Sequence, residues 1–154
     1  MRPPFEQVVR EHGTVVMRVC RALLSPTDAD EAWSETFLSA LQAYPRLRPD
    51  SDVRAWLVTI AHRKAIDQMR AASRRAVPSG HLPEVLTHDP EPAEHGLRAA
   101  LDRLAPKQRH AVVYRYLADM SYANVAALLG TSEAAARRNA ADGIARLRTE
   151  GAGR

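Results

Sequence analysis

The sequence predicts an all-α protein of two small helical domains joined by a proline-rich linker. Of its 154 residues only 5% are aromatic, and helix-forming Ala, Leu, Arg and Glu are frequent. Apolar residues recur at three- and four-residue spacing in several stretches, as on one face of a helix. Residues 77–93 hold four of the ten prolines, a density that stops helices and strands alike. We therefore expect a first domain at residues 1–76, a linker at 77–93 and a second domain at 94–154.

Three helices are expected in the first domain. An apolar face that includes Val8, Val16 and Cys20 predicts a helix over about residues 4–24. Ser25-Pro26-Thr27-Asp28 is typical of a helix start, because Ser caps, Pro suits the first turn and an acid suits the positive end. The apolar face of this second helix is predicted as Ala29, Trp33, Phe37, Leu41 and Tyr44. Asp50-Ser51-Asp52 then caps a third helix, which carries Val53, Trp56, Leu57, Ile60 and Ala61 on one side and ends in Arg70, Arg74 and Arg75.

The second domain is also expected to be helical. Leu97, Leu101 and Leu104 indicate its first helix. Pro106 opens a second helix, whose apolar residues are Val112, Val113, Tyr116 and Leu117. The stretch Ser121 to Ser132 then leads to a final helix over about residues 133–149.

That last segment has helix-turn-helix spacing. Ala126 and Ala136 are small where two helices have to cross closely, and Gly130 stands where the turn needs a positive φ. In this register an outward face is formed by Ser132, Glu133, Arg137, Arg138 and Ala141. A recognition helix reaches the major groove from such positions, and Arg suits guanine edges and phosphates. An ordinary helical hairpin with solvated arginines remains the alternative from spacing alone.

Composition excludes several other function classes. The net charge is +4 with a pI near 9.7, and 20 of the 22 basic residues are Arg, which permits a nucleic-acid partner. A single cysteine, Cys20, excludes an intramolecular disulfide and is expected to be a buried, inert thiol. We predict no catalytic residues, no metal site and no cofactor, because neither a His ligand pair nor a Gly-rich phosphate loop is present. With no apolar run for a membrane span and no secretory signal, a cytoplasmic protein is expected.

Two segments carry a family resemblance. The segment LDRLAPKQRHAVVYRYLADMSYANVAALLG, continued by TSEAAARR, resembles region 4 of bacterial sigma-70 family factors, which reads the −35 promoter element. Independently, DADEAWSETFLSALQAYPRLRPDSDVRAWLVTIAHRKAIDQMRAASRR resembles sigma region 2. Their order, with a short linker and no middle domain, resembles the extracytoplasmic function (ECF) subgroup.

The resemblance implies a transcription initiation factor without an active site of its own. Its implied partners are core RNA polymerase, through the β′ clamp helices and the β flap, and promoter DNA, with an anti-sigma factor as an optional further partner. The polymerase-binding residues implied are Asp30, Glu31, Ser34 and Glu35. The −10 element would be contacted from a loop and the helix after it, by Arg46, Arg48, Arg54, Trp56, Arg63, Lys64, Asp67 and Arg70. The outward face given above would read the −35 element.

Three features depart from the family pattern. Ser34 replaces a usual Gln, and Arg63 replaces a usual Asn. The recognition helix has Asp142, which would repel phosphate, and Gly143, which is expected to weaken the helix. We therefore expect an unusual −35 preference. Two alternatives stay open: a regulator that binds DNA without polymerase, and a degenerate sigma-like module that binds an anti-sigma factor without initiating transcription.

Overall fold

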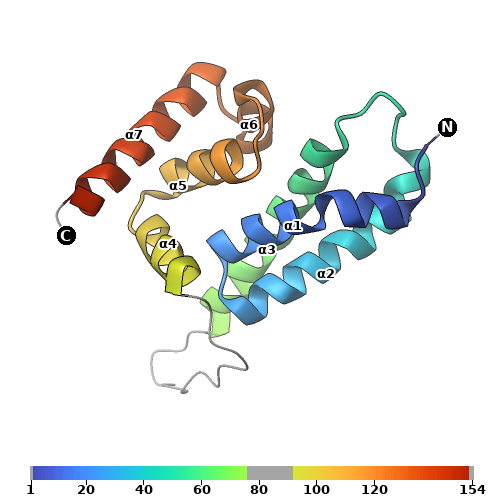
Figure 1. Ribbon diagram of the computed structural model, residues 1–154, viewed down its shortest axis with the longest axis horizontal. Coiled ribbons are helices and arrows are strands. Elements are labelled where there is room, and N and C mark those ends of the chain that lie inside the picture. Colours follow the sequence, from blue (N-terminus) through green and yellow to red (C-terminus); the bar gives the residue numbers. More distant parts are fainter. Residues whose placement is uncertain (1, 76–91, 153–154) are drawn as a thin grey trace.

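A computed structural model of the protein describes residues 2–75 and 92–152, and within these residues the fold is all-α, as predicted. Figure 1 shows the first three helices grouped together and the later ones forming a second group beside them. The elements are α1 Phe5–Leu23, α2 Pro26–Ala43, η1 Tyr44–Arg46, α3 Val53–Arg75, α4 Pro92–Asp102, α5 Pro106–Val112, η2 Val113–Leu117, α6 Tyr122–Leu129 and α7 Glu133–Ala152.

Local sequence signals set the starts of α2 and α3. The Ser25 hydroxyl accepts a hydrogen bond from the Asp28 amide at 3.4 Å, and Pro26 occupies the first helical turn. The Asp52 carboxylate accepts one from the Ala55 amide at 3.1 Å. Both caps satisfy amides that the first turn leaves unpaired, so these two predicted helix starts are confirmed.

Apolar residues of α1, α2 and α3 form a core between the three helices. Val16, Ala29 and Leu57 are fully buried in it. The Phe37 ring lies 4.6 Å from the Trp33 ring and 6.4 Å from the Phe5 ring, centroid to centroid, which places Phe37 in the core. Leu41, however, is 52% exposed, so the prediction that it lies on the apolar face was wrong. The buried face of α2 passes through Ala40, and the next residue is turned about 100° away from it.

The predicted linker at residues 77–93 falls almost wholly outside the described residues. Its last two residues are already helical, because α4 begins at Pro92. Proline is tolerated in a first turn, where its missing N–H would have no intrahelical partner. The end of α4 is tied to α5 by Arg109, whose guanidinium donates to the Leu101 and Leu104 carbonyls at 3.1 and 3.3 Å.

A π-helical turn, η2, changes which tyrosine is buried. The Ala118 amide bonds to the Val113 carbonyl five residues back, at 3.1 Å. This wider turn brings Tyr114 into the core at 0% exposure and leaves Tyr116 54% exposed. The prediction that Tyr116 belongs to the apolar side was therefore wrong, because it assumed an α-helical period through this segment.

The two groups of helices contact each other. Helix α1 packs against α2 and α3 on one side and against α4 and η2 on the other. Buried residues of both groups, among them Val19 on α1 and Leu101 on α4, belong to one continuous apolar cluster. No pattern in the sequence predicts this junction.

Candidate nucleic-acid interface

The helix-turn-helix predicted from spacing is present in α6 and α7. The Ser121 hydroxyl caps α6 by accepting from the Asn124 amide at 3.1 Å, and the Ser132 hydroxyl caps α7 by accepting from the Ala135 amide at 3.0 Å. Gly130 ends α6 with φ 65° and ψ 38°, the left-handed conformation that glycine adopts without strain. Val125 and Ala136 are fully buried where the two helices cross.

The prediction that one face of α7 points outward is confirmed by the exposure of its side chains. The five residues predicted to face outward are all exposed: Ser132, Glu133, Arg137, Arg138 and Ala141. Arg137 is also held in place within the protein. Its guanidinium lies 2.8 Å from the Glu133 carboxylate and 4.6 Å from the centroid of the Tyr122 ring.

A stacked cluster beside the recognition helix was missed by the sequence analysis. The Arg115 guanidinium lies 4.6 Å from the Tyr122 ring centroid and donates to the Met120 carbonyl at 2.9 Å. Tyr122 therefore carries two guanidinium groups, those of Arg115 and Arg137. A hydrogen bond to Tyr122 raises the pKa of the exposed Tyr116 phenol. The signal that was available is a single arginine between two tyrosines, Tyr114-Arg115-Tyr116, with a third tyrosine at Tyr122.

Asp142 and Gly143 do not interrupt α7, which continues to Ala152. The expectation that Gly143 weakens this helix overlooked its packing. A Cβ placed on Gly143 would lie 2.6 Å from Val112 Cγ2 and 3.3 Å from the Gln108 carbonyl oxygen. Among the glycines that the structure describes, Gly143 leaves the least room for a Cβ, because α7 packs closely against α5 at this position. Asp142 is exposed.

The residues predicted to contact a −10 element divide between two faces of α3. Arg63, Asp67 and Arg70 are exposed and follow the i, i+4, i+7 spacing of one face. Lys64 beside them is partly buried. Arg54 lies elsewhere, where its guanidinium donates to the Asp119 carbonyl at 3.3 Å and lies 3.8 Å from the Asp119 carboxylate.

The loop before α3 is held by the N-terminal segment. Arg46 and Arg48 are exposed on it, while Trp56 is partly buried with its ring 6.4 Å from that of Tyr44. Arg2 donates to the carbonyls of Tyr44 and Leu47, and the Tyr44 hydroxyl donates to the Pro3 carbonyl. The contribution of Arg2 was not predicted, because nothing in its neighbourhood in the sequence points to a loop more than 40 residues away.

An acidic and apolar stripe lies on α2. Asp30, Glu31 and Ser34 are exposed and Glu35 is partly exposed. Farther along the helix Leu38 is 63% exposed and Leu41 is 52% exposed. Two large apolar side chains next to a row of acids form a surface of the kind that a protein partner covers.

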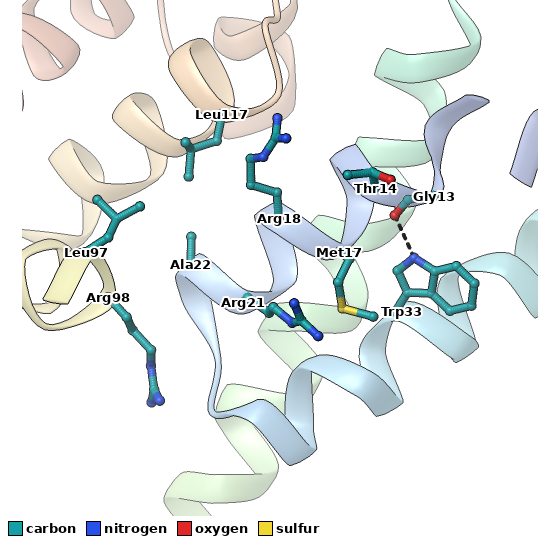
Figure 2. A pocket seen from close by; sticks show the side chains of 10 residues that line it. All are labelled: Gly13, Thr14, Met17, Arg18, Arg21, Ala22, Trp33, Leu97, Arg98 and Leu117. Atoms are coloured by element: carbon teal, nitrogen blue, oxygen red, sulfur yellow. Dashed lines mark hydrogen bonds between the residues drawn. The ribbon is translucent and has the colours of Figure 1, made fainter. Parts of the chain in front are cut away.

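A groove of about 440 Å³ lies where the two helix groups meet. Figure 2 shows the side chains that line it. Helices α1 and α2 supply Met17, Arg18, Arg21 and Trp33, and Leu97, Arg98 and Leu117 face them from α4 and η2. The Trp33 indole donates to the Gly13 carbonyl at 2.8 Å and is thereby fixed in the wall. The groove combines an apolar floor with three guanidinium groups.

Comparison with known proteins identifies both halves of the chain. The family model described as Sigma-70 region 2 matches residues 8–75, and the one described as Sigma-70, region 4 matches residues 95–147. RNA polymerase sigma factor CarQ of Myxococcus xanthus is 30% identical, over 94% of this chain and 87% of its own. ECF RNA polymerase sigma factor SigM of Mycobacterium tuberculosis is 33% identical, over 95% of this chain and 76% of its own.

Solved structures of other proteins have a fold similar to that of this chain. CnrH, solved in complex with the cytosolic domain of CnrY, aligns with a TM-score of 0.73 at 26% identity, over 94% of this chain and 85% of its own. The sigma factor RpoE of Bartonella quintana, solved with the anti-sigma factor NepR, aligns with a TM-score of 0.79 at 22% identity, over 94% of both chains. The second match shows likeness of fold alone.

Proposed function

The chain belongs to the ECF subgroup of the sigma-70 family, and we propose from this premise that it binds core RNA polymerase and directs promoter recognition and transcription initiation. One observation supports this function above all others. Both promoter-reading halves are present in family order, and the second presents a capped helix-turn-helix with its arginine face exposed. We propose residues 1–76 and 94–154 as the two functional units, with 77–93 as the connection.

The −35 element is assigned to α7 and the stacked cluster beside it. Ser132, Glu133, Arg137, Arg138 and Ala141 form the face that would enter the major groove. The Tyr122 ring and the Glu133 carboxylate orient the Arg137 guanidinium before DNA arrives. A guanidinium that is already oriented loses less conformational entropy on binding, which favours a base edge or a phosphate as its target. Arg115 adds a second positive charge on the same ring.

The −10 element is assigned to α3 and the loop before it. Arg63, Asp67 and Arg70 supply the exposed helix face with the partly buried Lys64 beside it, and Arg46 and Arg48 supply the loop. Unstacking a base costs a few kcal/mol, so a loop that receives one has to be held in shape. The bonds from Arg2 to the Tyr44 and Leu47 carbonyls support such a role. Arg54 and Trp56 complete the assignment.

The α2 stripe is assigned to core polymerase. Asp30, Glu31, Ser34 and Glu35 give it a negative charge that suits a basic partner helix. Leu38 and Leu41 extend it with apolar area that only a partner would bury. We place the β′ clamp helices on this stripe and the β flap on the second unit. Because polymerase performs the chemistry, the protein needs no catalytic residues and acts wherever polymerase acts, in the cytoplasm. No helix in the described part of the chain is long and apolar enough to cross a bilayer.

An anti-sigma factor is the further partner that we assign, and the groove between the helix groups is its proposed site. The similar structures of CnrH and RpoE were solved with the cytosolic domain of CnrY and with NepR, respectively. In this chain the groove offers Leu97, Met17 and Trp33 beside the guanidinium groups of Arg18, Arg21 and Arg98. An acidic amphipathic helix is the partner chemistry that such a surface fits.

Reconstitution tests the function directly. The purified chain is mixed with sigma-free bacterial core polymerase, the complex is isolated by gel filtration, and run-off RNA is assayed on sheared genomic DNA of the source organism. A complex that produces RNA with defined start sites is the expected result. A complex that produces none would favour the degenerate module, whereas DNA binding without any complex would favour the polymerase-independent regulator.

A further inference from the structure

A small polar cluster joins the two helix groups. His62 on α3, His110 on α5 and Tyr114 on η2 bring their rings together, with centroid distances of 5.6 Å for the two histidines and 5.3 and 6.1 Å from Tyr114 to His62 and His110. The Tyr114 hydroxyl is hydrogen bonded to His62 Nδ1. Tyr114 is completely buried, and a buried hydroxyl without a partner is costly. The packing of Tyr114 therefore depends on a side chain from the other helix group.

A second contact lies two turns away along the same helix. Arg54, Val58 and His62 follow one another at four-residue spacing and share one side of α3. Arg54 reaches the turn between η2 and α6, where it contacts both the carbonyl and the carboxylate of Asp119. Asp119 has a φ of 54°, the left-handed conformation that Asp and Asn tolerate better than most residues. One side of α3 is thus tied at two points to the helix-turn-helix half.

We propose that this docked arrangement is a closed state of the free protein, latched by His62–Tyr114 and Arg54–Asp119, which has to open before Arg54 contacts promoter DNA. While Arg54 Nη2 donates to the Asp119 carbonyl and lies 3.8 Å from the Asp119 carboxylate, the guanidinium is held against Asp119 and its charge is partly neutralised, so a phosphate has to compete with Asp119 for it. The DNA part of this inference rests on the proposed function. The closed state itself rests on the contacts alone and is tested without DNA.

The charges around the latch make it sensitive to acid. Burial lowers the pKa of His62, and the adjacent Arg63 lowers it further. Burial, His62 and Arg109 lower the pKa of His110 from 6.5 to about 4. From the remaining elements, the groups facing the cluster are the Tyr114 phenol on η2 and the Cys20 thiol on α1, both uncharged because burial raises their pKa values. The protonated form of either histidine is therefore disfavoured by burial and by nearby positive charge.

The direction of the pH effect follows from these shifts. Opening removes His62 and the burial that α3 provides, which raises the pKa of His110 towards its ordinary value, so the open state binds protons more readily than the closed state. The contribution of His110 to the stability of the closed state over the open state is fully present above about pH 7. It is lost progressively as the pH falls from 6.5 towards 4. At pH 5 His110 alone is expected to lower the closed-to-open ratio by at most roughly thirtyfold, the limit in which opening releases the whole shift.

A distance measurement on the free, full-length chain tests the latch. Spin labels are attached at Gln42→Cys on α2 and Ala145→Cys on α7, both exposed positions in different helix groups, with Cys20→Ala as the background. Pulsed electron paramagnetic resonance at pH 7.5 is expected to give one narrow distance. Tyr114→Phe, which keeps the ring but loses the hydroxyl, is expected to add a second, longer population. Lowering the pH to 5 is expected to do the same.

Matched controls separate the latch from loss of folding. Tyr116→Phe removes the hydroxyl of an exposed tyrosine two residues away and is expected to leave the narrow distance unchanged. His110→Phe keeps an aromatic ring and is expected to weaken the response at pH 5. Circular dichroism on each variant reports whether the helices are intact. A broad distribution of spin-label distances at pH 7.5, in the labelled chain without latch substitutions, would overturn the closed state. A single narrow distance under every condition would overturn the latch. Run-off transcription by the wild-type chain tests the proposed function separately.

Discussion

Single residues act in this protein mainly through how closely they allow neighbours to approach. Gly143 is the clearest case, because a Cβ there would lie 2.6 Å from Val112 Cγ2 and 3.3 Å from a backbone carbonyl of α5. In the sequence this glycine looked like a defect of the recognition helix. In the structure it stands at the crossing of α7 and α5, where a larger residue would push the two helices apart.

In Gly143→Ala, forcing an extra methyl group into a packed site is expected to cost about 1–3 kcal/mol. The intrinsic gain in helix propensity, about 1 kcal/mol, opposes this cost, so the expected net destabilisation is up to about 2 kcal/mol. The free energy of unfolding is measured by urea titration with circular dichroism.

Gly96→Ala on α4 is the matched control, because no other group lies within 4 Å of a Cβ placed there. This variant is expected to gain about 0.5–1 kcal/mol from helix propensity alone. A stabilisation of equal size in both variants would show that α7 and α5 are not in tight contact at Gly143.

At the scale of the element, α7 combines exposure with internal support. Arg137 is oriented by Glu133 and Tyr122, and Arg138 follows it on the exposed side. Arg137→Ala combined with Arg138→Ala is expected to reduce −35-dependent initiation by roughly tenfold or more, at about 1–3 kcal/mol for each specific arginine contact. The measurement is run-off transcription, with gel filtration to show that polymerase binding is retained.

Arg146→Ala on the same helix provides the comparison, since Arg146 is paired with Glu150 near the far end of α7. It is expected to leave initiation close to wild type. Unchanged initiation in the double variant at every −35-dependent promoter would show that the register assigned to the recognition helix is incorrect.

On α2, the element-scale prediction concerns apolar residues that the fold leaves uncovered. Leu38→Ser combined with Leu41→Ser is expected to weaken binding to core polymerase by roughly tenfold or more, because each leucine would lose about 1–2 kcal/mol of burial against the partner. Thermal stability is expected to stay nearly unchanged, since both side chains are more than half exposed in the free protein. Binding is measured by fluorescence anisotropy of the labelled chain with core polymerase.

The matched control for the α2 variant is Ala145→Ser, a polar change at an exposed position of α7. Wild-type polymerase affinity is expected for it. If the double leucine variant bound as tightly as this control, the polymerase surface would have to lie elsewhere on the protein.

At the scale of the whole molecule, the junction between the helix groups links stability to pH. The unfolded chain returns His110 to its ordinary pKa of 6.5, while the folded chain holds it at about 4. The unfolded state therefore takes up protons first, and folding free energy is lost as the pH falls from 6.5 towards 4. Between pH 7.5 and 5 the loss from His110 is about 2 kcal/mol.

His110→Phe is expected to remove this part of the pH dependence. Thermal melting is measured for the wild type and the variant at pH 7.5 and 5. Because both proteins carry the same carboxylates, the difference between their losses of stability reports on His110 alone. Parallel pH profiles for wild type and variant would contradict a buried, neutral His110.

Local chemistry made much of the fold predictable. The caps at Ser25 and Asp52 and the left-handed Gly130 depend on neighbours within four residues, so short-range patterns were sufficient to place these two helix starts and the turn. The outward face of α7 was predictable for the same reason, because a helical period carries exposure from one residue to the next. Leu41 was misplaced because the apolar period was extended to it, although the buried face of α2 passes through Ala40. Tyr116 was misplaced because an α-helical period was extended through the π-helical turn η2.

The sequence by itself determined the all-α class, the starts of α2 and α3, the helix-turn-helix and, through two motif-bearing segments, the family. These properties depend on local backbone chemistry and on residue order. Only the tertiary structure decided that Arg54 faces Asp119, that Tyr114 is bonded to His62, that Arg137 stacks on Tyr122 and that Gly143 lies against α5. Each of these contacts joins different helices or turns, and no pattern within one helix specifies which distant side chain its face will meet.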